Sequence, residues 1–119
     1  MQKILLKSKI HRVKITDANL EYEGSISIDE DLMEKAGILP YEKVNVWNIN
    51  NGGRFETYAI KADRNSGDII VNGAASRLVQ IGDTIIIATF GIYDENELKN
   101  FKPVLVYVDE KNCPVDIVK

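Results

Sequence analysis

Two stretches of the chain share one pattern: Leu39-Pro40-Tyr41-Glu42-Lys43-Val44-Asn45-Val46 and Gln80-Ile81-Gly82-Asp83-Thr84-Ile85-Ile86-Ile87. Each follows a short expected helix and passes through an acidic turn into a segment typical of a β-strand. A repeated turn-strand unit in a short chain suits a small pseudo-symmetric barrel, which also removes exposed sheet edges. Because few positions match, chance similarity is the alternative explanation.

The rest of the chain also has the pattern of a mainly β protein. Residues 4–15 alternate, which places Lys9, His11 and Val13 on one face of a strand and Ile10 and Arg12 on the other. Further strands are expected at residues 20–28, 44–49, 55–62, 69–71, 84–90 and 104–108, which are rich in Ile, Val, Thr and Tyr. Turn residues at 51–53 and 65–68 separate some of these strands.

Two or three short helices interrupt the expected strands. Asp29 can cap a helix over residues 30–36, and Gly37 can end it in the left-handed conformation. Residues 74–79 predict one or two helical turns, and residues 94–100 predict a third helix capped by Asp94. No linker or low-complexity segment divides the chain, so we expect one domain spanning residues 1–119.

Composition excludes several classes of function. The 119 residues are 45% hydrophobic with a formal charge of −3, which argues against a protein that grips nucleic-acid phosphates. One cysteine, Cys113, and one histidine, His11, make a metal site improbable and an internal disulfide impossible. There is no apolar signal-peptide core and no stretch long enough to span a membrane, so a cytoplasmic location is the default expectation.

The segment Tyr22-Glu23-Gly24-Ser25 could support unusual chemistry. A serine hydroxyl can attack the preceding carbonyl and turn the amide into an ester. Glycine before the serine removes the Cβ that would crowd this attack. Elimination and hydrolysis then leave a pyruvoyl group at a new N-terminus and release ammonia. Taken alone, a Gly-Ser pair is far more often an ordinary turn.

Other candidate residues are also individually ambiguous. Asn72-Gly73-Ala74-Ala75 could present backbone N–H groups to a carboxylate, or could simply begin a tightly packed helix. Lys9 and Arg54 could meet an anionic substrate, although solvated surface cations are commoner. Tyr58 could donate a proton and Thr57 could polarise a carbonyl, but both residue types are common in strands. Trp47 is most simply explained as a core residue.

Taken together, these segments resemble the aspartate 1-decarboxylase family, the pyruvoyl-dependent enzymes that make β-alanine for pantothenate and coenzyme A synthesis. The matching segments occur in order and at the expected spacing over residues 1–90. They are Lys9–Val13, Tyr22–Ser25, Ala36–Ile38, Val46–Asn48, Asn51-Gly52, Arg54-Phe55, Thr57–Ile60, Asn72–Ala75 and Gly82-Asp83. No departure occurs at a position that carries chemistry.

The resemblance implies a double-psi β-barrel that assembles as a homotetramer with active sites between neighbouring subunits. It also implies a proenzyme that breaks between Gly24 and Ser25 into chains 1–24 and 25–119. The second chain would begin with a pyruvoyl group, which condenses with L-aspartate to form a Schiff base. Whether a helper protein assists this maturation is left open by the sequence.

The same resemblance implies roles for the candidate residues. Thr57 corresponds to the residue that assists cleavage and contacts substrate, and Tyr58 to the proton donor. Asn72 and Gly73–Ala75 correspond to the substrate-binding segment, while Lys9 and Arg54 lie near the substrate carboxylates. Arg54 is the first choice for holding the side-chain carboxylate. Roles for His11 and residues 91–119 are not implied.

One conflict and two alternatives accompany this interpretation. Thr57 and Tyr58 are adjacent on an expected strand and should point to opposite faces. One site can use both only if the strand is twisted or bulged, or if two subunits reach the site. The first alternative is a hydrolase with Ser25 as a simple nucleophile. The second is a non-catalytic barrel, such as a dimeric nucleic-acid-binding regulator, although the acidic balance disfavours it.

Overall fold

Strands dominate the structure, a computed structural model that describes residues 1–119. The elements in chain order are β1 (Lys3–Lys14), β2 (Asp17–Asn19), β3 (Ser25–Asp29), α1 (Glu30–Ala36), β4 (Lys43–Asn48), β5 (Arg54–Ala62), β6 (Ile69–Asn72), the 3-10 helix η1 (Gly73–Leu78), β7 (Thr84–Tyr93), β8 (Val104–Val108) and β9 (Pro114–Val118). Neither helix has the length and apolar character needed to cross a membrane.

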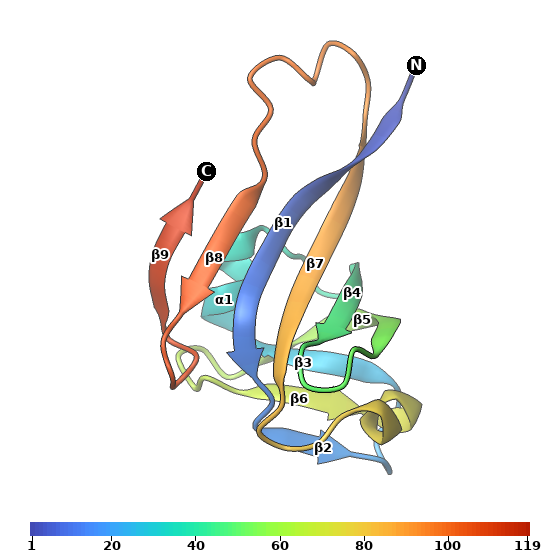
Figure 1. Cartoon of the computed structure of the whole chain (residues 1–119), viewed down its shortest axis with the longest axis vertical. Helices are drawn as coiled ribbons and strands as arrows, with labels where there is room; N and C mark the ends of the chain where they lie inside the picture. Colours follow the sequence, from blue (N-terminus) through green and yellow to red (C-terminus); the bar gives the residue numbers. More distant parts are fainter.

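The central strands close into a barrel (Figure 1). Starting from β1, hydrogen bonding runs through β7, β4, β5, β3 and β6 to β2. β2 follows β1 after only two residues, and between them the Thr16 N–H donates to the Ile69 carbonyl at 2.8 Å. The last strand of this series, β2, is thus connected directly to the first strand, β1. This connection closes the barrel and leaves no open sheet edge between the two strands. The expected double-psi β-barrel is confirmed, with two of the two or three short helices that were expected.

Apolar side chains from all sides of the barrel fill its interior. The fully buried residues include Ile10, Ile26, Ile28, Val44, Val46, Val71, Ile85 and Ile87. α1 adds Leu32, Met33 and Ala36 to the same cluster. Each of the larger side chains stabilises the fold by roughly 1.5–3 kcal/mol relative to exposure. This core holds the surrounding strands, and the residues they carry, in fixed register.

The alternation expected for β1 is interrupted by two bulges, one between Leu6 and Ser8 and a second one after Ile10. The second bulge changes the facing of the residues that follow it. Ile10 pairs with Ile87 and Val13 with Ile85, so two β1 residues oppose the single residue between those partners. Arg12 takes up the extra length with a φ of 66°. The bulge reverses the facing of the strand, so Ile10 and Val13 are both fully buried.

The capping prediction for α1 is confirmed. The Asp31 N–H donates to the Asp29 carboxylate at 2.8 Å, and Gly37 ends the helix with a φ of 69°. The helix expected at residues 94–100 is wrong, because these residues form turns. Asp94 and Glu97 exchange two hydrogen bonds of 3.0 Å, but a seven-residue segment with little apolar surface to bury does not continue as a helix.

The strand expected at residues 20–28 begins only at Ser25. Asn19 accepts the Glu21 N–H on its side chain at 3.1 Å and the Tyr22 N–H on its carbonyl at 3.4 Å. Turn hydrogen bonds of this kind compete with strand pairing. Residues 20–24 therefore form an exposed turn that leads directly into β3.

The last strands lie outside the closed barrel. The strand expected at residues 104–108 is present as β8. It pairs in parallel with β1, and the unexpected β9 pairs with β8. Asn112 anchors their hairpin, since its side chain bonds the N–H and carbonyl of Lys14 and the carbonyl of Gly67, each at 2.8 Å. At the other end, β1 and β7 extend beyond the barrel as a long two-stranded arm (Figure 1).

Candidate active site

Ser25 is the first residue of β3 and is fully buried. Its φ is 140°, a backbone conformation that residues with a side chain rarely adopt. A residue held in such a region stores about 1–3 kcal/mol of strain, which the surrounding structure must offset. The backbone strain therefore lies at the Gly24–Ser25 peptide bond, the bond at which the sequence suggests cleavage.

Asn72 holds the side chain of Ser25. The two residues are opposite each other in the antiparallel pairing of β3 with β6. The Asn72 amide nitrogen donates to the Ser25 hydroxyl at 3.0 Å and to the Ser27 hydroxyl at 3.1 Å. Asn72 is itself buried, so its bond to Ser25 is shielded from water and its bond to Ser27 is partly shielded.

Gly73 packs directly against Gly24. Its φ is 72°, and a Cβ at this position would lie 2.8 Å from the Gly24 Cα and 2.9 Å from the Gly24 nitrogen. Real Cβ atoms do not approach backbone atoms so closely. Ala74 and Ala75 continue from Gly73 into the first turn of η1. The structure thus brings Asn72 and Gly73 to Gly24 and Ser25, with Ala74 and Ala75 immediately behind them.

Tyr58 lies beside Ser25 on the neighbouring strand. β3 and β5 run parallel with Ile26 opposite Ala59, so Ser25 comes level with Tyr58, roughly 5 Å away between backbones. Tyr58 is partly exposed, and its ring centroid is 6.3 Å from that of Tyr41. The hydroxyl-bearing side chain is therefore free to face a substrate.

Thr57 and Tyr58 point to opposite faces of the sheet. β5 pairs with β4 in unbroken register from Arg54 to Tyr58, so no bulge turns the two side chains to the same side. Thr57 shares its face with Ala59, which is fully buried in the core, whereas Tyr58 is on the outer face. A bulge is thereby excluded as the explanation for joint use of these residues.

The structure does not bring Lys9 and Arg54 to Ser25 within one chain. Arg54 is the first residue of β5, four positions before Tyr58 and roughly 13 Å away along the strand. Its guanidinium carbon lies 4.8 Å from the centroid of the Trp47 ring, a cation–π contact. Lys9 is on β1, which β7, β4 and β5 separate from β3 in the sheet.

Lys9 and Arg54 nevertheless share one surface, the outer face of the sheet formed by β1, β7, β4 and β5. Their neighbours Ile10 and Phe55 point inward, one fully buried and the other packed on the core. Strand alternation therefore turns both cations outward. Trp47 is half-buried on this outer face rather than in the core, so the core assignment made from sequence is wrong.

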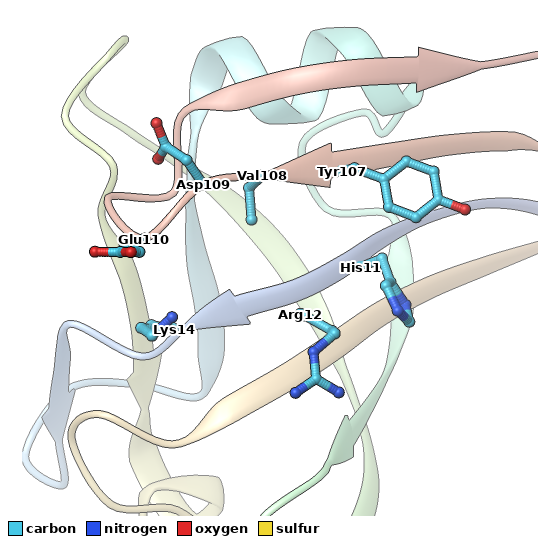
Figure 2. Close-up of a pocket in the computed structure, with 7 residues that line it drawn as sticks. All are labelled: His11, Arg12, Lys14, Tyr107, Val108, Asp109 and Glu110. Carbon is cyan, nitrogen blue, oxygen red and sulfur yellow. The ribbon is translucent and has the colours of Figure 1, made fainter.

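The largest hollow of the structure, about 370 Å³, lies away from Ser25. His11, Arg12, Lys14, Tyr107, Val108, Asp109 and Glu110 line it (Figure 2). Figure 2 shows Asp109 and Glu110 at the β8–β9 turn, with the His11 ring directed away from them. Burial lowers the pKa of His11, and the positive charges of Lys9 and Arg12 lower it further. The buried His11 Nδ1 has no hydrogen-bond partner.

Two features of the Ser25 cluster escaped the sequence analysis. Ser27 was not singled out, although alternation on a strand places it on the same face as Ser25. The contact between Gly73 and Gly24 joins residues far apart in the chain, and only the folded structure reveals it. The fold and this cluster together define a small double-psi β-barrel protein with a candidate active site centred on a serine.

Comparisons with known proteins extend this description. The family model described as Aspartate decarboxylase matches residues 1–115. A protein from Thermoanaerobacter pseudethanolicus named "Aspartate 1-decarboxylase" is 60% identical over 98% of this chain and 100% of its own length. One of the same name from Acetivibrio thermocellus is 60% identical over 95% of this chain and 90% of its own. The chain belongs to the aspartate decarboxylase family.

A solved structure shows a more distant likeness. The rationally designed protein mkDPBB_sym_86 aligns with 65% of this chain and 90% of its own, at 17% identity and a TM-score of 0.49.

Proposed function

We propose that the protein decarboxylates L-aspartate to β-alanine and CO2 by means of a pyruvoyl group that it makes from Ser25. The observation that carries the proposal is the strained and buried Ser25, with Asn72 on its hydroxyl and Gly73 against Gly24. The relatives named aspartate 1-decarboxylase support the substrate and the reaction. Production of β-alanine for pantothenate, in the cytoplasm, is the cellular role that follows.

Self-cleavage begins with attack of the Ser25 hydroxyl oxygen on the Gly24 carbonyl carbon. The carbon–nitrogen bond breaks, the nitrogen takes up the hydroxyl proton, and an ester joins the two residues. Removal of the Ser25 α-proton then breaks the ester bond, so the oxygen leaves with Gly24 as a carboxylate. One water hydrolyses the remaining enamine to the ketone and ammonia departs. Relief of the backbone strain at Ser25 favours the first step.

The residues around Ser25 fit a small ketone in its place. Gly73 presents no side chain to the scissile bond, and the Asn72 amide is already directed at the serine oxygen. Once joined to the substrate's amino nitrogen, a pyruvoyl group supplies the electron sink that loss of CO2 requires. Substrate binding and proton transfer are then carried out by side chains and backbone groups of the protein.

We assign the role of general acid to Tyr58. It comes level with Ser25 on the adjacent strand and is partly exposed. A tyrosine hydroxyl is protonated at neutral pH and can deliver its proton to the carbon that loses CO2. Thr57 faces away from Tyr58 on β5, so its assignment to cleavage and substrate contact requires a site that two subunits share. Gly73–Ala75 are assigned to holding the substrate through the backbone.

A neighbouring subunit of a homotetramer supplies Lys9 and Arg54 in this proposal. Within one chain both cations lie away from Ser25 but on one outward surface, which suits a face that meets another subunit's site. Aspartate carries two carboxylates, and the fork of an arginine matches a carboxylate with two parallel hydrogen bonds. Arg54, held over Trp47, is the cation assigned to the side-chain carboxylate.

The test is the intact mass of the purified protein under denaturing conditions, followed by incubation with aspartate. We expect chains 1–24 and 25–119, the longer one lighter by one ammonia than a chain that starts with serine. Borohydride should then abolish production of β-alanine. Ser25→Ala should give a single uncut chain of 13.4 kDa without activity. Decarboxylation by this variant would refute the pyruvoyl mechanism.

A further inference from the structure

We propose that Ser27 is a positioning residue for the proposed self-cleavage, because its hydroxyl holds the Asn72 amide against Ser25. The inference rests on the function proposed above and adds a residue to its machinery. Ser25 and Ser27 are two positions apart on β3 and therefore share a face. Asn72 lies opposite Ser25 on β6 and reaches both hydroxyls.

The two hydrogen bonds use the full donor capacity of the Asn72 amide. Its nitrogen carries two hydrogens and donates to Ser25 at 3.0 Å and to Ser27 at 3.1 Å. The side chain is not diverted to capping η1, although Asn72 is the N-cap residue of that helix. Asn72 is 3% exposed and Ser27 is half-buried, so water does not readily replace Ser25 and has limited access to the bond with Ser27. Ser27 is therefore the second support of an amide directed at the reacting oxygen.

The orientation of this amide matters for the attack on Gly24. As the Ser25 oxygen gives up its proton, negative charge develops on it, and a donated N–H stabilises that charge. Without Ser27, one N–H of the amide loses its partner in a buried place, which is costly. Rotation of the amide relieves that cost but presents its carbonyl oxygen to Ser25. The acceptor then faces developing negative charge, and the attack slows.

Ser27 also has a role after cleavage. The Ser25 oxygen leaves with Gly24, so Asn72 loses one of its two partners. The bond to Ser27 is the one that remains, and it keeps the amide beside the position where substrate is processed. Loss of this bond should therefore lower kcat of the matured enzyme more than it alters KM.

The experiment compares Ser27→Val with Ser27→Thr in the full-length protein. The two replacements have nearly the same shape, but only threonine keeps the hydroxyl. The fraction of uncut chain is followed by intact mass from the time of purification at fixed temperature. We expect valine to slow cleavage roughly five- to tenfold, the effect of one hydrogen bond, and threonine to restore most of the rate.

Two outcomes would overturn the inference. Cleavage of Ser27→Val at the parent rate would show that Asn72 needs no second support. Equal slowing by valine and threonine would show that size, not the hydroxyl, is what matters at this position. Thermal unfolding of both variants in the Ser25→Ala background should agree within a few degrees, which separates positioning from folding. Failure of the parent chain itself to cleave, even when a cell extract that could supply a maturation helper is added, would instead refute the proposed function.

Discussion

Replacing Gly73 with alanine tests the contact on which the candidate site depends. The added methyl group would lie 2.8 Å from the Gly24 Cα, 2.9 Å from the Gly24 nitrogen and 3.2 Å from the Tyr22 carbonyl oxygen. All three are backbone atoms, so the chain itself must move. Alanine at a φ of 72° costs about 1–2 kcal/mol, and forced repacking adds about 1–3 kcal/mol. We therefore expect Gly73→Ala to lose about 2–5 kcal/mol of unfolding free energy.

Gly82→Ala is the matched control. Gly82 has a φ of 92°, but a Cβ there would meet no atom within 4 Å, so only the backbone cost of about 1–2 kcal/mol applies. Both variants are compared by urea unfolding in the Ser25→Ala background, at one protein concentration, so that each is a single uncut chain. With Ser25 present, Gly73→Ala should also slow cleavage, because the Gly24 peptide is displaced. Equal losses of stability in the two variants, with parent-rate cleavage of Gly73→Ala, would refute the close packing.

Three further predictions concern the proposed chemistry and the charged surface. Tyr58→Phe should mature normally but lose about a hundredfold or more in kcat, and parent-like turnover would remove Tyr58 as the acid. Arg54→Ala should raise KM for aspartate about tenfold or more, and unchanged kinetics would reassign the side-chain carboxylate to another cation. The pKa of His11 is lowered from its ordinary value of 6.5, so the unfolded chain binds this proton more readily than the folded chain. The contribution of neutral His11 to the unfolding free energy is therefore fully present above the unfolded pKa of 6.5. It is lost as the pH falls from there through the lower pKa of the folded chain. His11→Gln should therefore lose less unfolding free energy than the parent between about pH 7.5 and about pH 5.5, and equal losses would contradict this.

Local signals predicted local structure well. The cap at Asp29 and the left-handed stop at Gly37 were correct because both act within one helical turn. The facing of β1 was predicted correctly only from Ser8 to Ile10, between its two bulges, since a bulge depends on what the partner strand requires. The capping pair at Asp94 and Glu97 formed as its residues suggest, but a helix also needs a surface to pack on.

The candidate site was predicted in parts rather than as a whole. Gly24, Ser25, Asn72 and Gly73 meet as the family resemblance implies, yet their contact depends on strands paired across the barrel. Nothing in the sequence periodicity reports that Gly73 lies against Gly24. The positions of Lys9 and Arg54 relative to Ser25 cannot follow from one chain if two subunits share the site. The sequence thus names candidate side chains more readily than it gives the geometry that joins them.

The path of β1 and β2 through the barrel gives the proposed cut a physical consequence. Both strands belong to residues 1–24, and they pair with β7, β8 and β6 of the remaining chain. A break after Gly24 would turn the barrel into a complementation pair, in which a short peptide supplies interior strands to a larger fragment. Unfolding would then release two molecules, and renaturation would become a second-order reaction that dilution slows. The kinetic stability of the matured protein would depend on slow dissociation of the peptide 1–24. A denatured sample would refold poorly unless both chains remained together.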